Sequence, residues 1–396
     1  MKGVLYLDHA ATTPLAPEVL EAMLPYFTEH FGNASSRAHG YGSEAARGVE
    51  RGAEQLAGLM DVDPDELVFT SGSTEAINLA LKGVMERFGR HRRHLVTAAT
   101  EHSAVLEACA DLERRGYEVT TLPVDASGRV ALADLAAAIT PHTALCCLMH
   151  GNNETGVLHD TAALAAHCRT RGVVYVADTT QAVGRVPVHP RTLGVDVAVC
   201  SAHKLYGPKG VGALYVARDS PAAQFLPQVH GGGQQGGRRA GTLNVPGIVG
   251  LGAAAARAQA RMRAESSRLV ELRDAFERHL LDTCAPAHVN GAQAPRLPHI
   301  SNLTLPYLDA QVLLSRVRNR LAISTGSACA NAQLAPSHVL LAMGLSEAEA
   351  RASIRVSFGE SSTTANALDA AEAIAEAVAQ VRAESPLWEL HRDGLL

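Results

Sequence analysis

Lysine is scarce in this 396-residue chain. Of its 35 basic residues only four are lysines, and the others are arginines: Lys2, Lys82, Lys204 and Lys209. Charged residues make up 19% of the sequence and aromatic residues 4%, the formal net charge is −5, and no basic tract occurs. This composition predicts a well-buried globular protein and argues against a direct nucleic-acid partner.

Long apolar runs and paired cysteines are also missing. No apolar stretch approaches the length of a membrane span, and the first residues lack the apolar core of a signal peptide, so we expect a cytoplasmic protein without a membrane segment. The seven cysteines include no Cys-x-x-Cys pair, which argues against a disulfide framework and a zinc ribbon. The 18 histidines show no ligand spacing, and we predict no metal site. Five cysteines in apolar or helical patterns are predicted to fill the core: Cys109, Cys146, Cys147, Cys168 and Cys200.

Predicted strands and helices alternate along the first half of the chain. A helix is predicted from Pro17 to Phe27, and Ser43 is predicted to cap the next helix. Apolar runs then predict strands at 66–70, 94–97, 118–123, 144–149 and 173–177. Helical patterns lie between these runs, which predicts a mostly parallel α/β sheet with helices on both faces. In such sheets ligands bind at the carboxyl ends of the strands.

A second, smaller unit is predicted beyond about Val245. A long Ala- and Arg-rich helix begins there, and short strands and helices follow in an irregular order, which is typical of an α+β domain. A chain of 396 residues is also too long for one ordinary core. We therefore predict a large domain at residues 16–255 with a seven-stranded, mostly parallel sheet. Residues 1–15 and 256–396 are predicted to form the small domain.

The stretch 199–216 carries the first chemical signal. A predicted strand gives way to Ser201-Ala-His-Lys204, the chain turns at Gly207-Pro208, and a second apolar run follows. A lysine at a strand end can be held in a dry pocket, lose its proton and form a Schiff base with an aldehyde cofactor. Arginine cannot do this, because its guanidinium stays protonated. A surface lysine on a β-hairpin is the alternative that this stretch alone leaves open.

Polar residues follow two other predicted strands in the first half of the sheet. Ser73 and Thr74 open a helix after a glycine, where backbone N–H groups and the helix dipole can bind a phosphate. Either hydroxyl could instead simply cap that helix. His102 follows the next strand and could lie flat on an aromatic cofactor, although a lone histidine there is more often structural.

Two further loops complete the set. Asn153 offers hydrogen bonds to a phenolic oxygen or a carboxylate, Asp178 can keep a pyridine nitrogen protonated, and Gln181 can reach the neighbouring ring hydroxyl. Simple turns, including an Asx turn at Asp178, are the alternatives for these residues. The five loops would meet at one edge of the sheet. With Lys204 they form the set of groups that a pyridoxal 5'-phosphate (PLP) site requires.

An ordered series of motifs runs along nearly the whole chain. It comprises Tyr6-Leu-Asp-His-Ala-Ala-Thr-Thr-Pro, Phe31-Gly-Asn-Ala-Ser-Ser, Phe69-Thr-Ser-Gly-Ser-Thr-Glu, Thr100-Glu-His, Asn152-Asn-Glu, Asp178-Thr-Thr-Gln, Ser201-Ala-His-Lys, His230-Gly-Gly-Gly-Gln, Arg239-Ala-Gly-Thr, Ser324-Thr-Gly-Ser-Ala-Cys, Pro336-Ser-His-Val-Leu and Ile354-Arg-Val-Ser. In this series the chain resembles the cysteine desulfurases of the NifS/IscS type, within the class V aminotransferase group of PLP enzymes with the type I fold.

The resemblance implies a role in cofactor binding for each matched residue. Lys204 would hold PLP covalently, and His102 would stack on its pyridine ring. Asp178 would pair with the ring nitrogen, Gln181 with the ring hydroxyl, and Asn153 would lie near that hydroxyl and the substrate. The phosphate would be bound by Ser73, Thr74, Ser201 and His203.

The resemblance also implies a reaction and partners. Thr242 would reach the phosphate of a second subunit, which makes the protein a homodimer, and Arg355 would pair with the substrate carboxylate. L-cysteine would be converted to L-alanine, with its sulfur left as a persulfide on Cys329 in a loop of the small domain. An acceptor protein would then take the sulfur for iron–sulfur assembly, tRNA thiolation or DNA phosphorothioation.

Two other functions stay open on the residues alone. One is another PLP enzyme of the same fold, such as a selenocysteine lyase, a C–S lyase or a transaminase, none of which needs a persulfide on Cys329. The other is a non-catalytic scaffold, which would have no need of Lys204, His102 and Asp178. The chain also departs from the usual pattern of the group, and these departures leave the sulfur acceptor open. They are Gln235-Gly236 for Glu-Arg, Ala34 for Pro, and His159-Asp160 for Gln-Pro.

Overall fold

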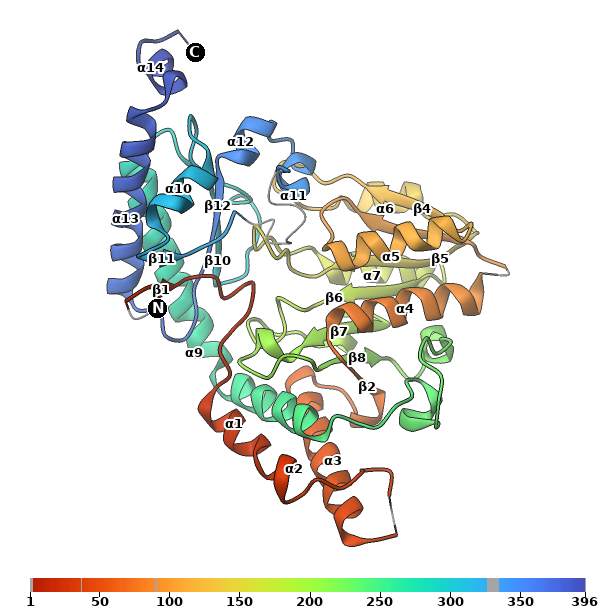
Figure 1. The fold of residues 1–396 in the computed structure, drawn as a ribbon. Coiled ribbons are helices and arrows are strands. Elements are labelled where there is room, and N and C mark those ends of the chain that lie inside the picture. Colours follow the sequence, from red (N-terminus) through yellow and green to blue (C-terminus); the bar gives the residue numbers. More distant parts are fainter. Residues whose placement is uncertain (1–2, 37, 90, 326–334, 396) are drawn as a thin grey trace.

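A seven-stranded sheet forms the centre of the larger part of the protein (Figure 1). The computed structural model describes residues 3–36, 38–89, 91–325 and 335–395, so Cys329 lies outside the described residues. The strand order is β2-β8-β7-β6-β5-β3-β4, and all neighbours run parallel except the two pairs that β8 makes. The strands are β2 (Leu67–Thr70), β3 (His94–Ala98), β4 (Glu118–Leu122), β5 (Thr143–Met149), β6 (Val174–Asp178), β7 (Val197–Ser201) and β8 (Gly212–Val216). The predicted mostly parallel α/β sheet is confirmed. For each of the five predicted strands, the first and the last residue lie within one position of the observed bounds.

The sheet is covered on both faces because its strands are apolar on both faces. Alternate residues of a strand point to opposite sides. In β6, Tyr175 therefore packs into one core, while Val174 and Val176 pack into the other. Helices α4 (Ser73–Phe88) and α5 (Ser103–Arg114) cover one face. The other face is covered by α3 (Gly40–Met60), α7 (Thr161–Thr170) and the start of α9 (Val245–Thr283), and the short helices α6 (Leu132–Ala138) and α8 (Pro190–Leu193) complete this part.

The predicted core thiols are confirmed. Cys109, Cys146, Cys147, Cys168 and Cys200 are all buried, and Cys284 is buried as well. All six are free thiols.

Two predictions near the N-terminus are wrong. The helix expected from Pro17 to Phe27 is split at Leu24 into α1 (Pro17–Met23) and α2 (Pro25–Thr28), because Pro25 has no N–H and begins a new helix instead. Ser43 does not cap α3. The cap is His39, whose Nδ1 accepts the N–H of Gly42 at 3.2 Å, so α3 begins at Gly40 and Ser43 lies inside its first turn.

The second unit is built on two small sheets and a helical layer. Strands β9 (His288–Val289), β10 (Ile300–Thr304) and β12 (Ser353–Ser357) pair antiparallel, and β1 (Leu5–Tyr6) pairs with β11 (Leu321–Ala322). The helices are α10 (Ala310–Val317), α11 (His338–Ala342), α12 (Glu347–Arg351), α13 (Thr364–Ala383) and α14 (Pro386–Arg392). The second half of α9 packs with α13 in a separate core, while its first half packs on the large sheet. Figure 1 shows α9 passing from one unit to the other. The predicted domain limit at residue 255 falls inside this helix and stays a prediction.

Neither a membrane helix nor a metal cluster occurs in the described part of the chain. Among residues 3–36, 38–89, 91–325 and 335–395, no helix is long and apolar enough to cross a membrane. The same residues contain no group of three or more His, Cys, Asp or Glu side chains that could hold a metal ion.

Candidate active site

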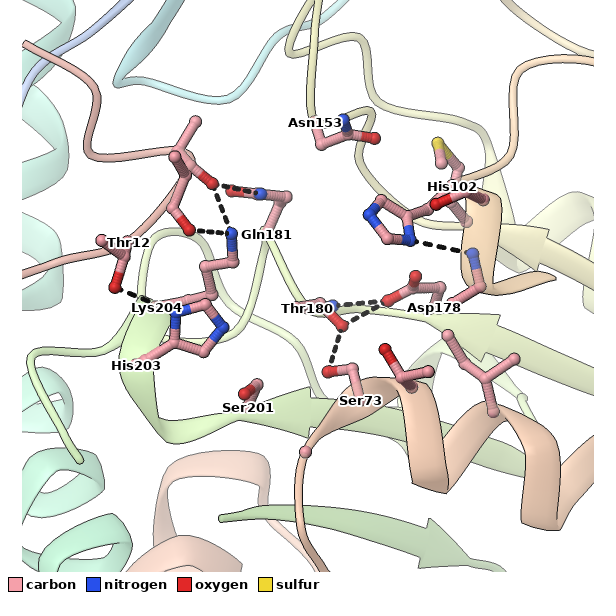
Figure 2. Close-up of a pocket in the computed structure, with 18 of the residues that line it drawn as sticks. Thr12, Ser73, His102, Asn153, Asp178, Thr180, Gln181, Ser201, His203 and Lys204 are labelled. Atoms are coloured by element: carbon pink, nitrogen blue, oxygen red, sulfur yellow. Dashed lines mark hydrogen bonds between the residues drawn. The ribbon is translucent and has the colours of Figure 1, made fainter. Parts of the chain in front are cut away.

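A pocket of about 700 Å³ lies at the carboxyl ends of the parallel strands. The loops after β2, β3, β5, β6 and β7 all contribute to it, as the topology of a parallel sheet predicts. Figure 2 shows how the side chains from these loops converge. Ten of the twelve predicted site residues line the pocket: Ser73, Thr74, His102, Asn153, Asp178, Gln181, Ser201, His203, Lys204 and Arg355. Thr242 is exposed and does not line it, and Cys329 lies outside the described residues.

The start of α4 forms an open cradle of N–H groups. The N-cap is Gly72 with a φ of 152°, and no side chain of the described residues caps the helix, so the alternative that Ser73 or Thr74 serves as the cap is wrong. The first N–H groups of a helix have no partner within the helix and attract anions. A Cβ on Gly212 of β8 would lie 2.7 Å from the Cα of Gly72, so glycine is needed there for the close approach. Ser201 reaches the same turn, and His203 lines the pocket two residues later.

Asp178 is fixed by the residue two positions after it. The Thr180 hydroxyl donates to Asp178 Oδ1 at 2.5 Å and shares a second hydrogen bond with Ser73 Oγ at 2.7 Å (Figure 2). The Thr180 N–H donates to the same carboxylate oxygen at 3.0 Å, so the Asx turn that we considered as an alternative is formed. This turn uses only Oδ1. Oδ2 makes no hydrogen bond within the described residues, and it is free to accept a hydrogen bond from a ligand in the pocket.

Lys204 is a buried amine with two carbonyl partners. It ends a short 3₁₀ turn after β7, and its Nζ donates to the carbonyl oxygens of Ala10 and Ala11 at 2.5 and 2.7 Å. Burial, reinforced by the nearby positive charge of Arg355, lowers the pKa of Lys204 from 10.5 to about 8. The pocket therefore stabilises the neutral, nucleophilic form of this amine near physiological pH.

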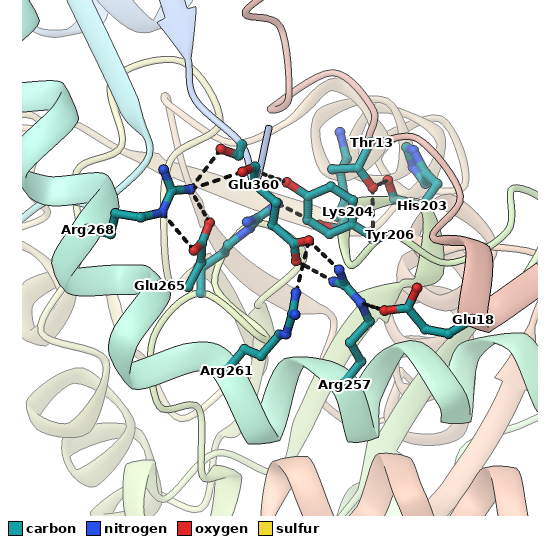
Figure 3. A network of polar contacts seen from close by, with 12 residues as sticks. Thr13, Glu18, His203, Lys204, Tyr206, Arg257, Arg261, Glu265, Arg268 and Glu360 are labelled. Atoms are coloured by element: carbon teal, nitrogen blue, oxygen red, sulfur yellow. Dashed lines mark hydrogen bonds and ion pairs between the residues drawn. The ribbon is translucent and has the colours of Figure 1, made fainter. Parts of the chain in front are cut away.

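The backbone after Lys204 is fastened to both units of the protein (Figure 3). Tyr206 has a φ of 63°, which is rare for a bulky residue and must be held by its surroundings. Its N–H donates to Thr13 Oγ1 at 2.8 Å, and its hydroxyl accepts the N–H of Glu360 at 2.7 Å. The Glu360 carboxylate in turn pairs with Arg257 of α9. The second unit and the long helix thus both help to fix the turn that carries Lys204.

The pKa of Lys204 leads to a pH prediction. Neutral amine forms as the pH rises through the pKa, so the rate at which PLP attaches to cofactor-free protein should rise up to about pH 8 and then level off. An ordinary lysine would keep gaining reactivity up to about pH 10.4. Stopped-flow absorbance at each pH would measure the rate, with Lys204→Ala as the control that should show no attachment. A rate that still climbs steeply above pH 9 would contradict the lowered pKa.

His102 faces the same pocket from the opposite side (Figure 2). It is the N-cap of α5, and its Nδ1 accepts the N–H of Ala104 at 3.1 Å. Burial is the main cause of its lowered pKa, so the ring is neutral and carries its proton on Nε2. A neutral imidazole whose orientation is fixed by the hydrogen bond from Ala104 is suited to stack on an aromatic ring.

Arg355 is a buried cation on β12 whose charge is balanced by Asp8. Its Nη2 donates to Asp8 Oδ1 at 2.8 Å, and its Nη1 donates to the Asn153 carbonyl at 2.9 Å. Its Nε has no hydrogen-bond partner within the described residues. A buried guanidinium requires an anionic partner, and the Asp8 carboxylate fills this role when no anionic ligand is bound. Because Arg355 also lines the pocket, its positive charge can attract a carboxylate there.

Several residues that shape the pocket were not predicted. Thr180 and Asp8 stand inside motifs that the sequence displays, but only the fold brings Asp8 to Arg355, which is 347 positions away. The contact of the predicted Gln181 with the Ala10 carbonyl, to which its Nε2 donates at 2.9 Å, was also not foreseen; it links the end of β6 to the N-terminal segment. His338 of α11 also lines the pocket, and its Nε2 donates to the Glu101 carbonyl at 3.0 Å. A signal existed for Thr180 alone, since a hydroxyl two residues after a strand-end aspartate commonly closes an Asx turn.

The pocket has the groups that PLP requires. An uncapped helix start behind a glycine suits the phosphate, a carboxylate with one free oxygen suits the pyridine nitrogen, and a buried amine of lowered pKa suits the aldehyde. The residues present thus fit the cofactor.

The class of protein follows from a comparison with known families. The family model "Aminotransferase class-V" matches residues 5–369, so the chain belongs to this family, whose members use PLP. "Cysteine desulfurase IscS" of Anaeromyxobacter dehalogenans (strain 2CP-C) is 44% identical over 395 residues, which cover 100% of this chain and 97% of that protein. Within the family the chain belongs to the cysteine desulfurases, which confirms the resemblance seen in the motifs.

Solved structures agree with this assignment. A structure described as "NIFS-LIKE PROTEIN" superposes with a TM-score of 0.88 at 33% identity, covering 95% of this chain and 99% of that one. "SspA in complex with cysteine" superposes with a TM-score of 0.79 at 35% identity, covering 89% and 98%. The type I fold of PLP enzymes is therefore confirmed.

Proposed function

We propose that this protein is a PLP-dependent cysteine desulfurase that converts L-cysteine to L-alanine. The observation that carries the proposal is the convergence of Lys204, Asp178 and His102 with the open helix start of α4 in one pocket, with Arg355 at its side. L-cysteine as the substrate is supported by the related structure described as containing cysteine. Family membership favours this activity over that of a transaminase or C–S lyase, and the complete set of pocket residues argues against a non-catalytic scaffold.

Each pocket residue has a defined task in this proposal. Lys204 would hold the aldehyde of the cofactor, and its free amine would act as base and acid toward the substrate carbons. His102 stacks on the ring, and Asp178 keeps the ring nitrogen protonated. When bound, PLP supplies an electron-withdrawing ring to the Cα of the amino acid. The phosphate is held at the start of α4 and by the turn after β7, through Ser73, Thr74, Ser201 and His203.

The remaining pocket residues orient the substrate and the ring. Arg355, which lines the pocket, holds the substrate carboxylate through its positive charge. Gln181 keeps an amide oxygen for the ring hydroxyl while its nitrogen is bound to Ala10, and Asn153 lies beside the bound amino acid. These contacts fix the substrate relative to Lys204 and so lower the entropy cost of the reaction.

Cys329 is the proposed sulfur-accepting nucleophile. No cysteine of the described part lines the pocket, and the six described thiols are all buried in the cores. Burial also raises the pKa of Cys109 and Cys200 to about 12, so neither is a thiolate at neutral pH. By elimination, Cys329 is the thiol available to take sulfur as a persulfide and pass it to an acceptor protein. Six unpaired thiols also agree with a reducing compartment such as the cytoplasm.

Conversion of L-cysteine is the direct test of this function. Purified protein supplied with PLP, L-cysteine and a thiol reductant should release L-alanine and sulfide in equal amounts. Amino-acid analysis and a sulfide assay would measure the two products. Release of pyruvate and ammonia instead of alanine would indicate a C–S lyase, and transfer of the amino group to an added keto acid would indicate a transaminase.

We also propose that the protein is a homodimer in which Thr242 reaches the phosphate of the partner. Leu24, Phe27, Phe31 and Tyr41 are each more than half exposed, which is unusual for large apolar side chains of a monomer. They lie around α2 and the start of α3, whose small core also includes Val245, three residues after Thr242. An apolar surface beside Thr242 is the expected place for a second copy of the chain.

Dilution should therefore release the cofactor. If Thr242 completes the phosphate site of the partner, protein diluted until sedimentation shows monomers should lose PLP into the ultrafiltrate. At concentrations that keep the dimer, the same protein should retain PLP. A monomer that keeps both its cofactor and its activity would contradict the shared site.

A further inference from the structure

The side chain of Gln235 completes the edge of the central sheet. Among the described strands, β2 lies at the end of the sheet and pairs only with β8, so no described strand neighbours the other side of its backbone. The Phe69 N–H donates to Gln235 Oε1 at 2.6 Å, and Gln235 Nε2 donates to the Phe69 carbonyl at 3.0 Å. One side-chain amide therefore makes the pair of hydrogen bonds that a neighbouring strand would make at this residue.

The backbone of Gln235 adopts a conformation that needs such support. Its φ is 53°, and Gly236 and Gly237 follow with φ values of 66° and 79°, so three successive residues are left-handed. Glycine takes this conformation readily, but a residue with a Cβ rarely does so unless its surroundings hold it. The two hydrogen bonds to Phe69 supply this restraint.

A second anchor ties the same loop to α4. The Arg239 guanidinium binds both carboxylate oxygens of Glu75, with Nε–Oε1 and Nη2–Oε2 distances of 2.6 and 3.1 Å. Glu75 belongs to the first turn of α4 and also accepts the N–H of Ser71 at 2.7 Å. The loop is thus fastened to the strand before the phosphate cradle and to the helix after it, and Thr242 follows directly.

We propose that Gln235 is a positioning residue whose neutral amide holds loop 233–241 against β2 and thereby sets the position of Thr242. The inference rests on the proposed function for the role of Thr242. An amide is required because Phe69 presents both a donor and an acceptor. A carboxylate can accept from the N–H, but it has no proton for the carbonyl and would face that oxygen with a negative charge.

The test compares variants of the PLP-loaded protein at two pH values. Gln235→Ala removes both hydrogen bonds to Phe69 and the longer one that Nε2 donates to the Arg239 carbonyl at 3.4 Å. Gln235→Glu removes only the donor while the carboxyl is ionised. Gln311→Glu adds the same charge at an exposed site in the second unit and serves as the control. Backbone hydrogen exchange of residues 233–241, corrected for intrinsic rates, and the rate of PLP release should be measured at pH 4 and pH 8. The charged groups beside position 235 are Arg238, which donates to the Gln235 carbonyl, and the Arg239–Glu75 pair.

Gln235→Ala should speed both loop exchange and PLP release by about tenfold at both pH values, the effect expected for two lost hydrogen bonds. Gln235→Glu should match Gln235→Ala at pH 8. At pH 4 it should recover toward the parent, because a carboxyl with an ordinary pKa of about 4.3 is then mostly protonated and can again donate to Phe69. Unchanged loop exchange in Gln235→Ala, or parent-like behaviour of Gln235→Glu at pH 8, would overturn the proposal.

A further variant separates this proposal from the proposed function. Thr242→Val should speed PLP release without changing loop exchange. Suppose that Thr242→Val leaves PLP release unchanged while the Gln235 variants alter loop exchange as described. Thr242 then does not bind the phosphate of the partner, but the proposal that Gln235 holds loop 233–241 against β2 is supported.

Discussion

Lys204→Arg is expected to abolish covalent cofactor binding and to lower L-cysteine turnover by about 10⁴-fold, since acid–base catalysis by one residue alone is worth ~10²–10⁴-fold. The arginine keeps the positive charge and can still donate to the Ala10 and Ala11 carbonyls that Lys204 contacts, so the fold should survive. It cannot lose its proton, and it can therefore neither bind an aldehyde nor act as a base. The variant separates the chemistry of Lys204 from its packing.

The matched control is Lys209→Arg. Lys209 also lines the pocket, but it lies beyond the Gly207-Pro208 turn and is exposed. Borohydride reduction followed by peptide mapping should attach the cofactor to Lys204 in the parent and in Lys209→Arg, and to no peptide in Lys204→Arg. A label on the peptide that carries Lys209 would show that the wrong lysine has been assigned.

Much of the fold could be predicted because its signals are local. The buried run of β5 and the strand ends before Ser73, His102 and Asp178 are visible as apolar stretches that give way to polar residues. Since parallel strands bring their carboxyl ends to one edge, the strand-end positions were enough to place seven predicted side chains around one pocket: Ser73, Thr74, His102, Asn153, Asp178, Gln181 and Lys204. Ser201, His203 and Arg355 were predicted from the family resemblance alone.

The features that could not be predicted depend on contacts between distant segments. Asp8 and Arg355 meet only because β1 and β12 belong to the same unit, and Gln235 reaches Phe69 across 166 positions. The cap of α3 was misplaced for a different reason. Ser43 has the better capping propensity, but the chain is already helical before it, and the ring of His39 provides the acceptor.

Cys329→Ser should retain PLP and bind L-cysteine but form almost no L-alanine. The cores hold the other six thiols away from the pocket, so no described cysteine can replace it. A serine hydroxyl is a poor nucleophile toward sulfur at neutral pH, because it is not ionised as a thiol can be. We expect turnover to fall by about 10³-fold or more, as for the loss of other catalytic nucleophiles. Cys284→Ser, which alters a buried thiol, is the matched control and should keep its activity.

Mass spectrometry of the intact protein after incubation with L-cysteine, without a reductant, tests the central claim most directly. The parent protein should gain one sulfur atom, peptide mapping should place it on Cys329, and Cys329→Ser should gain none. An added sulfur that persists in Cys329→Ser, or that maps to Cys284 or Cys109 in the parent, would contradict the account.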